Sequence, residues 1–153
     1  MSAGNVSQFL ELLFVGLLAG FELAIHYGIG TPPLSLAEDA QILLRQDMVR
    51  RLRILVPIIF LPSFVLAVWS VVQGWNEPGL VLRCAIVGML FIWILIRIVQ
   101  TVPVNSATLE WNPGAPPKDW RSLVERTERF HVVAAWVAVF AFLCSLLSNF
   151  QLR

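Results

Sequence analysis

Long runs of apolar residues, separated by polar stretches, dominate this chain. Four of the runs reach the length of about 20 helical residues that crosses the hydrocarbon core of a bilayer. They predict transmembrane helices near residues 10–30, 54–74, 79–102 and 131–150. Because only helices and closed barrels satisfy their backbone polar groups in lipid, the pattern indicates an all-α integral membrane protein.

The two long connections, 31–53 and 103–130, are expected to be partly helical. Thr31-Pro-Pro should stop the first helix, and Ser35-Leu-Ala-Glu38 has the pattern of a capping box that starts another. No breaker follows before Pro57, so this helix should run directly into the second span.

The second long connection has the same design. Asp119 can cap a helix that has no stop signal before the fourth span. We therefore predict one domain, residues 1–153, that forms an antiparallel four-transmembrane-helix bundle with two helical cytoplasmic extensions.

Basic residues gather in the two long connections. They are Arg45, Arg50, Arg51 and Arg53 in the first, and Lys118, Arg121, Arg126 and Arg129 in the second. By the positive-inside rule, both connections are expected in the cytoplasm and both termini outside. The first span lacks a cleavable signal pattern, so we expect a retained span and an integral protein of a bacterial inner membrane.

Composition narrows the function classes. Hydrophobic residues make up 58% of the chain and charged residues only 14%, whereas a soluble domain is about one quarter charged. The net charge of +1 and the lack of a Lys/Arg-rich run exclude a nucleic-acid-binding protein. Cys84 and Cys144 lie in apolar segments without CxxC spacing, which favours buried thiols over a disulfide or a metal pair.

Glu22 and His26 interrupt the first apolar run. An ionisable side chain inside a membrane is costly and should face a bundle interior or a wet cavity, so the pair marks a candidate functional site. Their i, i+4 spacing places both on one face of the helix.

The constant rise of a helix places further candidate site residues at similar depths in the membrane. At 1.5 Å per residue from the outer edge, Glu22 lies about 15 Å deep, His26 about 21 Å, Arg97 about 26 Å, His131 about 27 Å and Glu128 about 32 Å. Asn105, Trp111 and Trp120 of the second connection should cap this layer, which could bind a hydrophobic small molecule that enters from the lipid.

Three hypotheses account for these residues. In a structural one, Arg97 neutralises Glu22 or Glu128. In a second, His26, His131 and Glu128 hold a single transition metal, since Glu128-x-x-His131 has the spacing used in carboxylate bundles. In the third, a histidine and a carboxylate carry out metal-free acid–base chemistry while Arg97 stabilises an anion. We expect Glu22 to be a functional acid without a charged partner.

A stripe of small residues, Gly16, Gly20 and Ala24, lies on another face of the first span. Such a stripe lets a second helix approach closely. It predicts contact with another helix of the bundle, with a second copy of the chain, or with a larger membrane complex.

Several motifs together resemble a known family. They are Gly20-Phe-Glu-Leu-Ala-Ile-His26, Arg51-Leu-Arg-Ile-Leu-Val-Pro57, Val102-Pro-Val-Asn105, the Trp111 and Trp120 pair, and Glu128-Arg-Phe-His131. In this order they resemble a small four-span membrane family that includes anthrone oxygenase-like proteins. For that branch, the resemblance implies cofactor-independent oxidation of an anthrone to an anthraquinone with molecular oxygen.

Two functions are therefore expected. The first is an anthrone oxygenase-like oxidoreductase that acts on a hydrophobic phenolic or quinone-like molecule. Its catalytic candidates are His26, His131, Glu22 and Glu128, and its substrate-binding candidates are Arg97, Asn105, Trp111 and Trp120. The alternative is a non-catalytic bundle, an accessory subunit or a lipid- or quinone-binding module. A polar cavity would favour the enzyme, and direct pairing of the polar side chains without a cavity would favour the module.

Overall fold

The computed structural model describes residues 3–29 and 35–151. Their helices are α1 (Ala3–Leu23), η1 (Ala24–Ile29), α2 (Glu38–Gln73), α3 (Leu80–Ile96), η2 (Arg97–Thr101), α4 (Val102–Glu110) and α5 (Trp120–Gln151). The segments η1 and η2 are π-helical continuations of α1 and α3. No strand occurs in these two ranges, which confirms the predicted all-α class.

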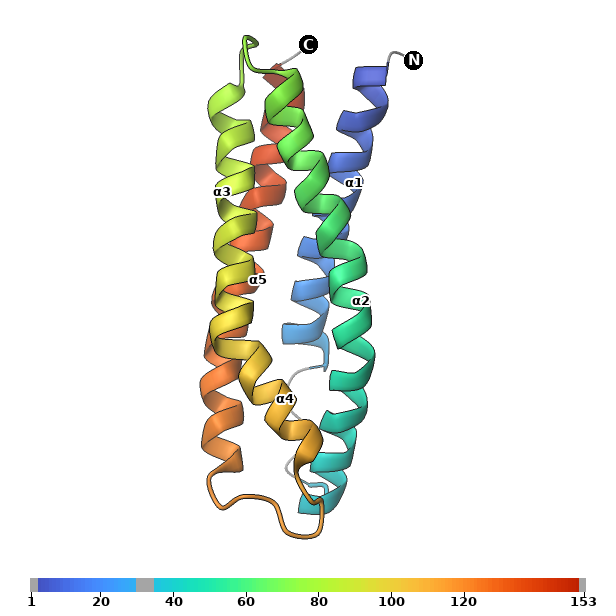
Figure 1. Ribbon diagram of the computed structural model, residues 1–153, viewed down its shortest axis with the longest axis vertical. Helices are drawn as coiled ribbons and strands as arrows, with labels where there is room; N and C mark the ends of the chain where they lie inside the picture. The colour runs from blue at the N-terminus through green and yellow to red at the C-terminus, as the bar shows by residue number, and fades with distance from the viewer. Residues whose placement is uncertain (1–2, 30–34, 152–153) are drawn as a thin grey trace.

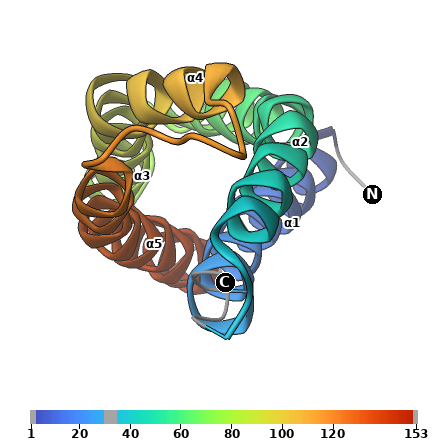
Figure 2. The same ribbon diagram turned by 90° about the horizontal axis from the view of Figure 1, so that it is seen from below.

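The helices form one elongated bundle (Figure 1). α1 begins and α5 ends at the same end of the bundle, where α2 also turns into α3, whereas α2 begins and α4 ends at the opposite end. Seen from below, the helices surround a common axis, and α4 lies on the side between α3 and α2 (Figure 2). The predicted antiparallel four-helix bundle is therefore confirmed.

Four helical stretches of the described residues are long and apolar enough to cross a membrane. They are Val6–Gly28, Glu38–Gln73, Leu80–Glu110 and Trp120–Phe150. Large apolar side chains on their outer faces are exposed, for example Ile58 at 59% and Val81 at 81%. Such a surface is costly in water but not in lipid. The chain is thus an integral membrane protein with four transmembrane helices.

The two helical extensions are present as predicted. α2 has 36 residues and continues through Pro57 and Pro62 without interruption, and α5 has 32 residues and begins directly after Asp119. The predicted stop at Thr31-Pro-Pro lies outside the described residues.

The predicted capping box at Ser35 is wrong. α2 begins at Glu38, and its N-cap residue is Ala37, which makes no side-chain capping hydrogen bond. The Glu38 carboxylate instead accepts a hydrogen bond of 2.7 Å from the indole nitrogen of Trp120. It therefore joins the start of α2 to the start of α5 rather than reaching back to Ser35.

The main core lies where α1, α3 and α5 meet. Ala134, Ala138 and Ala141 of α5 are fully buried beside Val15 and Leu18 of α1. The alanines present little bulk, so the helix axes can come close together. Phe60 of α2 stacks on Trp93 of α3 at a ring distance of 4.8 Å and extends this core to the fourth helix.

The small-residue stripe of the first span is divided between two environments. A methyl group on Gly16 would lie 2.9 Å from the ring of Phe142 in α5, so Gly16 serves contact within the bundle. Gly20 and Ala24 are exposed on the outside. Contact of that outer part with a second copy or with a larger complex stays a prediction.

A polar cluster closes the end of the bundle where α1 begins. The buried guanidinium of Arg83 donates to the Ser70 carbonyl oxygen at 3.2 Å and to the Glu77 carboxylate at 2.9 Å. Farther inside, Ser145 of α5 donates a hydrogen bond of 3.2 Å to the buried Glu11 carboxylate of α1. These contacts join α3 to α2 and α5 to α1 at this end.

Candidate functional site

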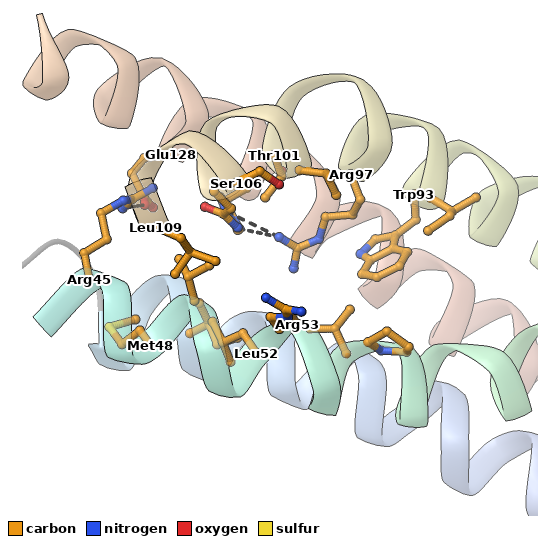
Figure 3. A pocket seen from close by; sticks show the side chains of 18 residues that line it. Arg45, Met48, Leu52, Arg53, Trp93, Arg97, Thr101, Ser106, Leu109 and Glu128 are labelled. Atoms are coloured by element: carbon orange, nitrogen blue, oxygen red, sulfur yellow. Dashed lines mark hydrogen bonds and ion pairs between the residues drawn. The ribbon is translucent and has the colours of Figure 1, made fainter. Parts of the chain in front are cut away.

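A cavity of about 480 Å³ lies in the half of the bundle opposite the Arg83 cluster. Its walls come from α2 on one side, from α3, η2 and α4 on the other, and from α5 and Ile25 of η1. Ten of the eighteen lining residues are apolar, and the other eight are polar: Arg45, Arg53, Arg97, Thr101, Asn105, Ser106, Glu128 and His131. Figure 3 shows Arg97 and Arg53 approaching it from different walls.

Arg97 is the centre of a group of buried polar contacts beside the cavity. One terminal nitrogen donates to the Glu22 carboxylate of α1, and the other lies 2.9 Å from Nδ1 of His131 in α5. The guanidinium carbon also lies 5.1 Å from the centre of the Trp93 ring. Because a guanidinium can only donate, the His131 nitrogen that faces it must carry a free lone pair. The imidazole is therefore in its neutral form.

Glu128 of α5 forms a second polar contact point. One carboxylate oxygen lies 3.6 Å from a terminal nitrogen of Arg45, and the other lies 3.9 Å from Nδ1 of His26. One carboxylate thereby faces α2 and η1 together. His26 is not part of the cavity lining, so it can act on the cavity only through Glu128.

Both π-helical segments border this cavity. A π-turn adds a residue to the helix and re-aims the side chains that follow, and such turns are frequent at functional sites. η1 carries His26, and η2 carries Arg97 and Thr101. Neither π-turn could be predicted from the amino-acid pattern.

Unsatisfied polar atoms gather at the same place. In the part of the chain that the structure describes, six buried side-chain atoms have no hydrogen-bond partner: Glu22 Oε2, His26 Nδ1, Arg45 Nε, Trp93 Nε1, Arg97 Nε and Thr101 Oγ1. Arg45, Trp93, Arg97 and Thr101 line the cavity, and Glu22 and His26 pair with lining residues. Since buried polar groups are nearly always bonded, this concentration marks the cavity as a place for polar chemistry.

Six of the eight predicted site residues lie in the lining of the cavity or directly behind it. Arg97, Asn105, Glu128 and His131 line the cavity. Glu22 and His26 stand behind it and contact it through Arg97 and Glu128. The expectation that Glu22 lacks a charged partner is wrong, because η2 places Arg97 directly against it.

Trp111 and Trp120 lie elsewhere. Their rings pack edge to face at 6.4 Å and form a small apolar cluster with Ile42 and Val124. Neither is among the residues that line the cavity. They hold the second connection against α2, where Gln46 also donates to the backbone oxygens of Thr108 and Trp111 at 2.9 Å.

The metal hypothesis gains no support from the geometry. Within residues 3–29 and 35–151, no group of three or more His, Cys, Asp or Glu side chains is placed to hold a metal ion. His131 turns toward Arg97, whereas His26 and Glu128 face each other. The cationic Arg45 also contacts Glu128 where the metal would need it.

Sequence reasoning missed several lining residues. As basic residues, Arg45 and Arg53 predict only the orientation of the chain, although the lining positions 45, 48, 49, 52, 53 and 56 of α2 follow a helical period. That period could have shown that one face of the extension continues into the bundle. Trp93, a fully buried tryptophan of α3, gave no such signal.

A polar cavity was expected for an enzyme, and direct pairing of the polar side chains for a non-catalytic module. The structure has both features. Glu22 and Arg97 pair directly, as in a structural bundle, yet a cavity with polar walls lies beside them. No protein-family model, curated protein or solved structure matches the chain. The resemblance to anthrone oxygenase-like proteins therefore stays a prediction.

Proposed function

We propose that this protein is a membrane oxidoreductase that oxidises a hydrophobic phenolic or quinone-like small molecule with molecular oxygen. The observation that carries the proposal is that four side chains lining one cavity, and two more that pair with lining residues, each have a buried polar atom without a hydrogen-bond partner. An apolar cavity with a few convergent polar groups suits a flat aromatic molecule that carries hydroxyl or carbonyl oxygens. The sequence resemblance supports the same reaction class.

The contacts of the lining residues suggest a separate role for each of them in the proposed reaction. An oxygen of the substrate replaces His131 as a partner of Arg97, whose positive charge stabilises the anion that forms. The His131 lone pair is then free to accept the proton. Glu22 holds Arg97 in place from behind, and Glu128, held by Arg45 and faced by His26, is the other group in the lining that can accept a proton.

The overall reaction balances without a further reductant. Loss of a proton from an acidic ring CH₂ group gives a delocalised carbanion, which transfers one electron to oxygen. The resulting radical and superoxide combine to a peroxide anion, which takes the proton back and becomes a hydroperoxide. Loss of water from the hydroperoxide leaves a carbonyl group. The CH₂ carbon is oxidised, one oxygen atom enters the product, and the other leaves as water.

A second candidate function rests on the Glu22–Arg97 pair. In this alternative the cavity binds a quinone or a lipid without turnover, and the paired charges serve only to hold α1 against η2. The chain would then be a binding module or an accessory subunit of a membrane complex.

Oxygen consumption by the purified protein in nanodiscs tests the proposal. With an anthrone as substrate, we expect uptake of one oxygen molecule per quinone formed, unchanged by a metal chelator. Catalase should return no oxygen, since the second oxygen atom leaves as water and not as hydrogen peroxide. His131→Gln should abolish the uptake, whereas the matched surface variant Arg121→Gln should retain it.

The outcomes separate the two candidates. Saturable binding of the anthrone or of its quinone product without oxygen uptake above that of empty nanodiscs would establish the binding module and overturn the enzyme. Uptake that persists in His131→Gln would overturn the role given to His131.

A further inference from the structure

The cavity opens on the side of the bundle. Four of its lining residues are exposed: Arg53 and Pro57 on α2, and Val102 and Ser106 on α4. The opening therefore lies between α2 and α4. Ile54 and Ile58, next to the exposed lining positions on α2, are 64% and 59% exposed and suit contact with lipid chains. A ligand with an apolar body can thus enter past apolar side chains on the flank of the bundle.

The charges that line the cavity are not balanced. Arg45 faces Glu128, and Arg97 is paired with Glu22. Arg53 also lines the cavity but forms no ion pair with an acidic residue of the described ranges. One positive charge is therefore left over, at the opening.

We infer that the cavity selects an organic anion, a molecule with one negatively charged oxygen group on an apolar body, and that Arg53 recognises this group at the opening. Arg53 approaches from the α2 side and Arg97 from the opposite wall, so the anionic group would lie between two guanidinium groups (Figure 3). The apolar body would lie against Val56, Ile94 and Trp93. A guanidinium is well suited to this task because it is always charged and presents several donors in one plane.

This inference deepens the proposed function, since it names the substrate class for the same cavity. A phenolate, a carboxylate and the phosphate of a lipid headgroup share the required chemistry. An anion held by Arg53 would also be kept near Arg97, where the proposed reaction stabilises negative charge.

Binding of a matched pair of probes tests the inference without any turnover. Anthracene carboxylate is anionic, and anthracene methanol is neutral with almost the same shape. In nanodiscs of phosphatidylcholine, saturable energy transfer from tryptophan to anthracene measures the affinity for each probe. We expect the wild-type protein to prefer the carboxylate.

Variants of neighbouring arginines locate the selectivity. Arg53→Gln should weaken carboxylate binding by roughly tenfold, the usual scale for loss of a charged hydrogen bond, and leave methanol binding unchanged. Arg53→Lys should keep part of the preference. Arg50→Gln, which removes an exposed arginine of the same helix outside the cavity, should have no effect on either probe.

A change of lipid identifies the source of the anion. If phosphatidylglycerol in an equimolar mixture competes with the carboxylate in the wild type but not in Arg53→Gln, the headgroup phosphate is the ligand; if it does not compete, the ligand is a free organic anion. Equal affinity of the wild type for both probes would overturn the inference, as would an unchanged preference in Arg53→Gln. Failure of the oxygen-uptake experiment would leave these binding results intact, so the two proposals fail separately.

Discussion

A terminal nitrogen of Arg97 lies 2.9 Å from Nδ1 of His131, in the interior of the bundle. The contact joins η2 to α5 across the wall of the cavity, and it fixes which state of the imidazole is present. A protonated ring would set two donors and two positive charges against each other, so the bond exists only with a neutral histidine. A neutral imidazole beside a cation can accept a proton only if an anion arrives with it, which couples the proton-accepting capacity of His131 to ligand binding.

The first prediction separates this bond from the chemistry of the ring. His131→Gln keeps an acceptor for Arg97 in its amide oxygen, so the melting temperature in detergent should stay close to that of the wild type. His131→Leu leaves the Arg97 donor unpaired and should lose about 1–3 kcal/mol of stability. Both variants should lack oxygen uptake. An equal melting temperature for both variants would show that the Arg97–His131 bond contributes nothing to the fold.

The second prediction concerns the opposite end of the bundle. A methyl group on Gly74 would lie 0.9 Å from a terminal nitrogen of Arg83, so Gly74→Ala must displace the guanidinium from Ser70 and Glu77. We expect a loss of about 1–3 kcal/mol, seen as a lower melting temperature in detergent.

Gly88→Ala is the matched control for Gly74→Ala. Gly88 lies inside α3, and a methyl group there meets nothing within 4 Å. Because alanine favours a helix over glycine by about 1 kcal/mol, this variant should melt at the same or a higher temperature. If both alanine variants behaved alike, the close approach of Arg83 to Gly74 would be of no energetic importance.

Much of the fold could be predicted from the pattern of apolar residues. The four spans and the unbroken lengths of α2 and α5 follow from run length and from the absence of breakers, because a helix in lipid satisfies its own backbone. The start of α2 could not be predicted in this way. Its first residue, Glu38, is hydrogen-bonded to Trp120, which is far away in the sequence.

The candidate site was only partly predictable, for a related reason. Depth arithmetic placed Glu22, His26, Arg97, Glu128 and His131 in one region because a helix advances by a constant rise. It could not tell which of them pair, since that depends on rotation about each helix axis, and the π-turns of η1 and η2 change the rotation just where His26 and Arg97 stand. The pairing of Glu22 with Arg97 and of Glu128 with Arg45 therefore required the structure.

The third prediction concerns orientation in the membrane. In a background of Cys84→Ala and Cys144→Ala, we expect Asp39→Cys and Lys118→Cys to react with a membrane-impermeant maleimide only after sealed cells are permeabilised. Asn76→Cys, in the turn between α2 and α3, should react in intact cells. We expect this orientation because the connections that contain Asp39 and Lys118 hold most of the Lys and Arg residues. Labelling of Asp39→Cys in intact cells would reverse the orientation, and labelling of only one of the two cytoplasmic positions would contradict the bundle topology.

The fourth prediction tests the buried pair of Glu22 and Arg97, which are 1% and 7% exposed. Removing one partner leaves the other charge buried and alone, so Glu22→Gln and Arg97→Met should each lose about 3–5 kcal/mol of stability.

The double variant removes both charges and should recover much of that loss, because neither is then left unpaired in the interior.

An exposed pair in the same protein provides the control: Asp47 and Arg51 of α2 lie 2.9 Å apart but are 53% and 78% exposed. Asp47→Asn should change the stability by no more than about 0.5 kcal/mol. Chemical or thermal unfolding in detergent, followed by circular dichroism, measures the stability of the wild type and of each variant. Should Glu22→Gln prove as stable as the wild type while oxygen uptake is lost, Glu22 would be a functional acid that the fold does not need, and its contact with Arg97 would serve the reaction alone.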